Sequence, residues 1–147
     1  MINKVHNIDC MELLKDTPDK YYQLAIVDPP YGIGAPKQAA TPAQRKKGAN
    51  RLNQGSGKLK GRVLNQSNCD WDDSIPSQEY FGELLRVGKT IIIFGGNYFT
   101  DMLPMSKHWI VWNKIGGHDF QNPFSDAELA WTSIPKKPIK MYTVIQQ

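Results

Sequence analysis

The stretch LAIVDPPYGIG, residues 24–34, decides how the rest of the sequence is interpreted. Its apolar run stops at Asp28, and two prolines and Tyr31 follow. Because YQLAIV at 22–27 has the length and composition of a buried strand, Asp28 is expected just beyond the strand's carboxyl end. A residue before proline stays extended, and the prolines have no N–H of their own. The stretch therefore predicts two hydrogen-bond acceptors, the Asp28 carboxylate and a prolyl carbonyl, beside the ring of Tyr31.

Two acceptors next to a flat ring suit a planar heterocycle that carries an amino group, such as adenine or cytosine. In a duplex that amino group is base-paired, so the base would have to be flipped out and held by stacking on Tyr31. The simpler interpretation is that residues 28–31 form only a turn after a strand. The four residues alone leave both interpretations open.

Strand-like and helix-like segments alternate over most of the chain. Strands are expected at residues 4–8, 22–27, 89–94, 108–114 and 126–133. Helices are expected at 9–16, at 76–88 and, briefly, after the glycines that follow residue 94. This alternation predicts an α/β fold with a mostly parallel sheet and helices on both faces, and ligands in such folds lie at the carboxyl ends of the strands.

Some residues with chemical potential have a simpler structural interpretation. Gly95, Gly96 and Asn97 follow a strand and resemble a cofactor loop, but packing or shaping of a base pocket is favoured for them. The large aromatic side chains in the second half of the chain are expected in the core rather than as stacking platforms: Trp109, Trp112, Phe120 and Trp131.

A basic segment interrupts the alternation at about residues 32–70. It is rich in Gly, Asn, Gln, Ser and Ala, so we expect a long mobile loop. The chain's net charge is +4, and since the stretch between Pro29 and Cys69 has no Asp or Glu, its eight basic residues account for the whole positive excess. The segment is either a solvated insertion or an arm that follows nucleic-acid phosphates. Its basic residues are Lys37, Arg45, Lys46, Lys47, Arg51, Lys58, Lys60 and Arg62.

Several classes of protein are disfavoured by what the chain does not contain. The sequence has no run of about 18 apolar residues that would span a membrane, and its N-terminus has no apolar secretory signal. Cys10 and Cys69 form no CxxC pair, and the three histidines fit no metal-ligand spacing. We therefore expect one cytoplasmic domain over residues 1–147 with no metal site.

The motif Asp-Pro-Pro-Tyr at 28–31 resembles motif IV of the S-adenosylmethionine-dependent DNA amino-methyltransferases. Residues 7–34 resemble the opening of that family, in which an acidic turn precedes the motif by about twenty residues. Residues 71–99, 108–114 and 124–133 resemble later stretches of phage and bacterial orphan members. The resemblance covers nearly the whole chain, and the Asp form of the motif is similar to the adenine-N6 branch.

The resemblance implies a Rossmann-like methyltransferase fold and a catalytic motif formed by Asp28, Pro29, Pro30 and Tyr31. Asp28 and the Pro29 carbonyl would accept hydrogen bonds from the adenine amino group, which aims its nitrogen at the methyl carbon. Tyr31 would stack on the flipped base, and the basic segment would bind DNA phosphates. The target is adenine rather than cytosine by this resemblance alone.

The resemblance also implies a cofactor site at Asp9, the adjacent Cys10 backbone and Asp28, although Asp9 is equally well explained as a helix N-cap. Family members of this order carry their main glycine-rich cofactor motif after a segment like residues 124–133, and no such motif follows here. We therefore expect an incomplete fold that binds S-adenosylmethionine weakly or not at all by itself. Three hypotheses stay open: a truncated adenine-N6 DNA methyltransferase, an inactive remnant that binds DNA, and half of a split enzyme completed by a homodimer partner or a C-terminal chain.

Overall fold

The computed structural model describes residues 4–34, 70–115, 125–136 and 138–143. Most of the expected basic loop, with all eight of its Lys and Arg residues, lies outside these ranges, as do Cys69 and Phe120. The chain divides into two compact units, one formed by Met1–Pro29 with Pro76–Gln147 and the other by Pro30–Ile75. Each unit is described by itself.

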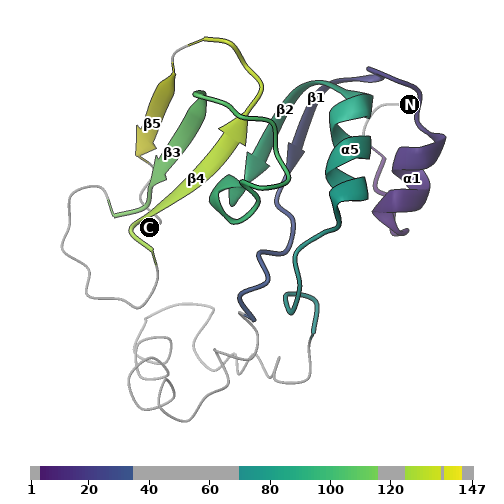
Figure 1. The fold of residues 1–147 in the computed structure, drawn as a ribbon, viewed down its shortest axis with the longest axis horizontal. Helices are drawn as coiled ribbons and strands as arrows, with labels where there is room; N and C mark the ends of the chain where they lie inside the picture. The colour runs from purple at the N-terminus through teal and green to yellow at the C-terminus, as the bar shows by residue number, and fades with distance from the viewer. Residues whose placement is uncertain (1–3, 35–69, 116–124, 137, 144–147) are drawn as a thin grey trace. The chain divides into compact units, whose positions relative to one another are not determined.

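The first unit contains a mixed five-stranded sheet in the order β1-β2-β4-β3-β5 (Figure 1). β1 is parallel to β2, and β3 is parallel to β5, whereas β4 is antiparallel to both of its neighbours. Four strands therefore share one direction and β4 opposes them, which confirms the α/β class. The strands are β1 (Tyr22–Val27), β2 (Gly88–Phe94), β3 (Trp109–Asn113), β4 (Ala127–Thr132) and β5 (Ile139–Thr143).

The helices of the first unit are α1 (Cys10–Asp16), α5 (Gln78–Val87) and the short 3₁₀ helix η1 (Gly96–Tyr98). α5 packs on β2, and α1 packs on α5. On β1, Leu24 and Ile26 keep 48% and 58% of their surface exposed, so the described helices leave that face of the strand uncovered. Helices on both faces are therefore not seen within the described ranges.

α5 begins and ends where the sequence indicates. The Ser77 hydroxyl caps its first turn by accepting from the N–H of Tyr80, and Gly88 is the C-cap. The helix buries Phe81, Leu84 and Val87 along one face. Phe81 is fully buried, and its ring lies 5.0 Å from that of Phe99. This apolar stripe anchors α5 against the buried side chains of β2.

The structure differs from the sequence predictions at three places. Residues 4–8 form no strand and are exposed, since only Val5 and Ile8 are apolar there and neither is buried. The short helix expected after the glycines is found as the three-residue 3₁₀ helix η1, and turns follow it. β5 was not expected, and the structure exposes it along its whole length.

Candidate functional site

Asp28 stands at the carboxyl edge of the sheet. It directly follows β1, whose last residue, Val27, pairs with Ile93 of the parallel strand β2. The Asp28 side chain is exposed and Pro29 is buried. The structure therefore puts an accessible carboxylate at the strand end, where α/β folds bind ligands.

The turn after β2 lies at the same edge and is shaped by glycine. Gly95 has a φ of 66°, which favours glycine, and it starts η1. A Cβ on Gly96 would stand 2.6 Å from the Cβ of Trp131 and 2.9 Å from its backbone nitrogen. Gly96 is therefore required for the packing of η1 against β4, which confirms the packing interpretation. Asn97, next to it, is exposed.

Trp109 and Trp131, on neighbouring strands, each donate their indole N–H to a backbone carbonyl. Trp131 is 4% exposed, and its Nε1 donates to the carbonyl of Pro104 at 3.1 Å. The Nε1 of Trp109 donates to the carbonyl of Ser106, also at 3.1 Å. Trp112 is half-buried on β3. The buried Trp131 thus confirms a core role, and none of the three is fully exposed for stacking.

Asp9 begins α1. Its Oδ1 accepts from the N–H of Met11 at 2.8 Å, so the capping interpretation is confirmed. Both Asp9 and the Cys10 thiol are exposed. The cap uses one oxygen of the Asp9 carboxylate. A carboxylate can accept several hydrogen bonds, so an exposed Asp9 can also accept from a ligand.

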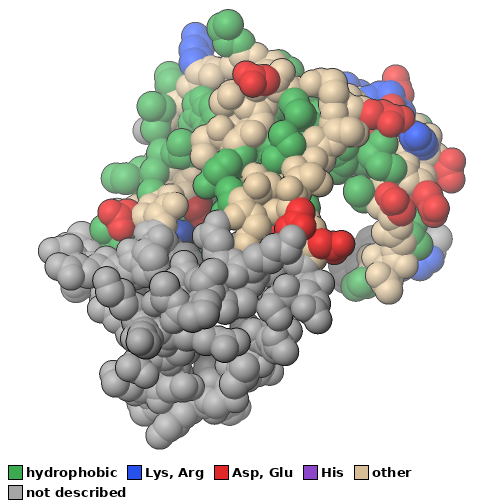
Figure 2. Space-filling model, turned by 60° about the horizontal axis from the view of Figure 1, so that its bottom comes forward, with side chains coloured by type: hydrophobic (Ala, Val, Ile, Leu, Met, Phe, Trp, Pro, Cys, Tyr) green, Lys and Arg blue, Asp and Glu red, His purple; other side chains and the backbone are tan. Residues whose placement is uncertain are grey.

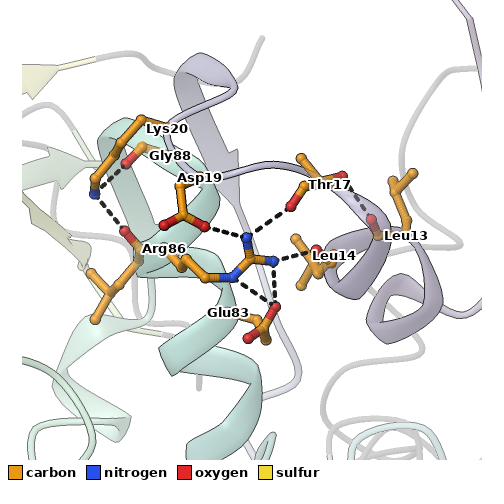
Figure 3. A network of polar contacts seen from close by, with 9 residues as sticks. Leu13, Leu14, Thr17, Asp19, Lys20, Glu83, Arg86 and Gly88 are labelled. Atoms are coloured by element: carbon orange, nitrogen blue, oxygen red, sulfur yellow. Dashed lines mark hydrogen bonds and ion pairs between the residues drawn. The ribbon is translucent and has the colours of Figure 1, made fainter.

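Arg86 ties α1 to α5 through its guanidinium group (Figure 3). It donates to the carbonyls of Leu14 and Thr17, both at 2.8 Å, where α1 ends. The same group binds the carboxylates of Asp19 at 2.7 Å and Glu83 at 2.6 Å. The free carbonyls of a helix C-terminus attract cations, so Arg86 fixes the end of α1 against α5.

Lys20 makes a second link beside Arg86. Its Nζ donates to the carbonyls of Leu85 and Gly88, at 2.8 and 3.0 Å, and these carbonyls lie at the end of α5. Lys20 itself has a φ of 54°, and its N–H donates to the carbonyl of Arg86. The segment that enters β1 is therefore held in place at its start, which orients the strand that ends at Asp28.

The ion pairs of this region shift the titration of their members. Donating hydrogen bonds to the carboxylates of Glu83 and, to a smaller extent, Asp19 raises the pKa of Arg86, and accepting from Arg86 lowers the pKa of Glu83. Burial raises the pKa of Tyr80 to about 12. Lys15 of α1 also pairs with Glu79 of α5 at 2.9 Å, which raises the pKa of Lys15. Figure 2 shows acidic and basic side chains gathered together at the right of the view.

The second unit contains the other half of the predicted motif, Pro30 and Tyr31. The N–H groups of Tyr31 and Gly32 both donate to Oδ1 of Asp72, at 2.7 and 2.9 Å. The N–H of Gly34 donates to the backbone carbonyl of Asp72 at 2.8 Å. Asp72 is only 2% exposed, and Tyr31 is half-buried. The backbone of Tyr31 is thus held by a buried acid about forty residues away.

Glycine makes this arrangement possible. Gly32 and Gly34 have φ values of 69° and 63°, so two positions of the turn are in the left-handed region. A Cβ on Gly32 would meet Cγ2 of Ile75 at 3.0 Å and its nitrogen at 3.2 Å. Asp72 was missed from the sequence, because nothing in the run Trp-Asp-Asp at 71–73 indicates which acid is buried.

The residues that the resemblance implies for S-adenosylmethionine fit part of a nucleoside site. Asp9 and Asp28 are exposed carboxylates in the first unit, and carboxylates accept from amino and hydroxyl groups. The glycines after β2 do not fit a cofactor cradle, because Trp131 already occupies the space beside Gly96. The described residues thus offer polar contacts to such a group and no glycine-rich support for it.

The described ranges show no group of three or more metal-ligating side chains and no helix able to span a membrane. A comparison of the sequence with models of known protein families gives no match, and a comparison with curated proteins also gives none. The functional interpretation therefore depends on the residues themselves and on the resemblance carried by residues 28–31.

Proposed function

We propose that this chain belongs to an S-adenosylmethionine-dependent DNA methyltransferase that modifies the N6 amino group of a flipped adenine. The observation that carries the proposal is the exposed Asp28 at the carboxyl end of a parallel strand, followed by Pro29, Pro30 and Tyr31. The mixed sheet is compatible with a Rossmann-like methyltransferase fold. A DNA substrate and two cysteines outside any CxxC pair fit a cytoplasmic protein.

Asp28 and the Pro29 carbonyl act on the amino group of the target base in this proposal. Both accept its N–H groups, which draws the nitrogen lone pair out of conjugation with the ring and stabilises the positive charge that develops on nitrogen. Tyr31 stacks on the base after it leaves the duplex. S-adenosylmethionine supplies the methyl group from its sulfonium when bound. The chain's own contribution is positioning and electrostatic stabilisation.

Asp9 and the Cys10 backbone would hold the nucleoside part of the cofactor, with Asp28 at the boundary between cofactor and base. The eight basic residues between Lys37 and Arg62 would bind DNA phosphates. A second copy of the chain, or a separate C-terminal chain, would supply further cofactor contacts if the chain binds S-adenosylmethionine weakly by itself.

An inactive DNA-binding module is the second candidate. It is favoured by one observation, the confinement of the chain's positive excess to a single segment without acids. Such a module would need the basic segment and would not need Asp28. The two candidates therefore differ in which substitution removes function.

Methyl transfer is tested by expressing the chain in cells that lack adenine methylation and measuring N6-methyladenine in their DNA by mass spectrometry. The wild-type chain is expected to produce it, and Asp28→Ala to abolish it while changing DNA affinity by no more than a few fold. Asp16→Ala, at the exposed end of α1, is the matched control and keeps full activity. Normal activity in the Asp28 variant would remove the assigned role.

DNA binding is tested by the salt dependence of affinity. Replacing Arg45, Lys46, Lys47 and Arg51 with alanine is expected to weaken binding and lower the salt slope by about 0.9 for each DNA phosphate that the variant no longer neutralises. The control replaces four exposed lysines elsewhere, which removes the same charge: Lys4, Lys89, Lys107 and Lys136. Equal weakening of binding in both variants would show a net-charge effect and exclude a binding role specific to the basic segment.

A further inference from the structure

We propose that Asp72 is a positioning residue that fixes the backbone of Tyr31 and thereby the ring on which the target base stacks. The role in stacking depends on the proposed function, whereas the hold on the backbone does not. Asp72 is one of the few buried polar residues in the described ranges. Its carboxylate is directed at the turn that follows the two prolines.

Two consecutive N–H groups converge on one oxygen. The N–H groups of Tyr31 and Gly32 reach Oδ1 of Asp72 at 2.7 and 2.9 Å. Successive N–H groups can point to the same side where the backbone turns, as it does at a left-handed residue, and such a turn makes a concave site for an anion. Gly32, with a φ of 69°, supplies that turn. The Asp72 carboxylate is the anion that occupies it.

The turn is also held on its other sides. The backbone carbonyl of Asp72 accepts from the N–H of Gly34 at 2.8 Å. Ile75 lies so close to Gly32 that a Cβ there would be 3.0 Å from its side chain. One residue thus accepts hydrogen bonds from the backbone at three of four consecutive positions, and Ile75 leaves no room for a side chain at Gly32.

A carboxylate suits this position better than its neutral amide. Hydrogen bonds from N–H groups to an ionised acceptor are about twice as strong as those between neutral groups. Asparagine would keep the size and one oxygen acceptor but lose that added strength. Alanine would leave both N–H groups without this acceptor in a partly buried place. We therefore expect the hydrogen bonding of the turn to weaken in the order Asp, Asn, Ala at position 72.

The test measures hydrogen exchange of the Tyr31 and Gly32 amides by NMR in the wild type, Asp72→Ala and Asp72→Asn. We expect exchange about 10- to 100-fold faster in Asp72→Ala and less than about tenfold faster in Asp72→Asn. Asp70→Asn, an exposed acid of the same segment, is the matched control and leaves both amides unchanged. The amides of β2 serve as the internal reference for global unfolding. If Asp72→Ala fails to fold, the isosteric Asp72→Asn provides the answer.

The second measurement is kcat and KM for DNA in the same variants. Asp72→Ala is expected to lower kcat by about 10- to 100-fold and to leave the KM for DNA within a few fold, because the ring is misplaced after the DNA has bound. Unchanged exchange at Tyr31 and Gly32, or unchanged kcat in an active enzyme, would overturn the proposal. If the wild type methylates no DNA but its turn depends on Asp72, the proposed function fails and the hold on Tyr31 is supported.

Discussion

Replacing Gly96 with alanine tests whether the two glycines after β2 serve packing or a ligand. The added methyl group would stand 2.6 Å from the Cβ of Trp131, 2.9 Å from its backbone nitrogen and 3.1 Å from Cζ3 of Trp109. Carbon atoms pack best at about 3.5–4.0 Å, so the shortfall at Trp131 is about 1 Å. Trp131 belongs to β4, which pairs with β2 and β3 on either side, and it cannot retreat without disturbing both ladders.

The expected cost is about 1–3 kcal/mol of unfolding free energy, the range for overpacking a well-filled core. The upper part of that range is expected because one of the close atoms is backbone. Gly82 is the matched control, since it is exposed in the middle of α5 and a Cβ there meets nothing within 4 Å. Gly82→Ala is expected to stabilise the fold by about 0.8–1 kcal/mol, because alanine is the better helix former.

Urea and thermal denaturation of both variants measure the effect. The two changes add the same methyl group and move stability in opposite directions, with roughly 3–5 °C in Tm for each kcal/mol in a domain of this size. A Gly96→Ala protein as stable as the wild type would refute the packing argument. If that stable protein had also lost affinity for S-adenosylmethionine, the turn would be a ligand cradle after all.

Two further predictions concern titrating groups of α5. Arg86→Met is expected to lower unfolding free energy at neutral pH. The variant should also lose less stability at acid pH. Arg86 lowers the pKa of Glu83 from 4.5, so the stabilisation by this pair is present above pH 4.5 and is lost as the pH falls through the lowered pKa. Denaturation at several pH values measures this, and an acid loss as steep as in the wild type would contradict it. Tyr80, whose pKa is raised to about 12 by burial, is expected to favour the folded state below its ordinary pKa of 10, an advantage lost as pH rises toward 12. Phenolate absorbance should therefore show a component near pH 12 that Tyr80→Phe removes, and persistence of this component in the variant would assign it to another tyrosine.

The parts of the fold that carry apolar patterns could be predicted from the sequence. α5 has a serine N-cap, a buried stripe and a glycine at its end, and its expected limits of 76–88 are close to the observed Gln78–Val87. The strands at 22–27 and 89–94 are runs of β-branched and apolar residues, and both were found. Local composition was sufficient where side chains face a core.

Pairing direction and edge strands could not be predicted in this way. β4 has the same kind of sequence as its neighbours, yet it runs antiparallel between β2 and β3, and direction is set by connections rather than by composition. All five residues of β5 are exposed, so this edge strand has no buried face that would mark it in the fold. Residues 4–8 show the opposite case. Val5 and Ile8 give a weak strand pattern, but the structure forms no strand there.

The motif at 28–31 illustrates why local sequence finds a candidate site before it finds what holds the site in place. Asp28 and Pro29 belong to the unit of the sheet, whereas Pro30 and Tyr31 belong to the unit held by Asp72. Asp28 directly follows the last pair of the β1–β2 ladder, and the backbone of Tyr31 is held by a buried carboxylate about forty residues away. Substitutions at Asp28 should remove methyl transfer, whereas substitutions at Asp72 should speed hydrogen exchange at Tyr31. If exchange at Tyr31 stayed unchanged in the Asp72 variants, other contacts would hold this turn and the argument from the hydrogen bonds would be wrong.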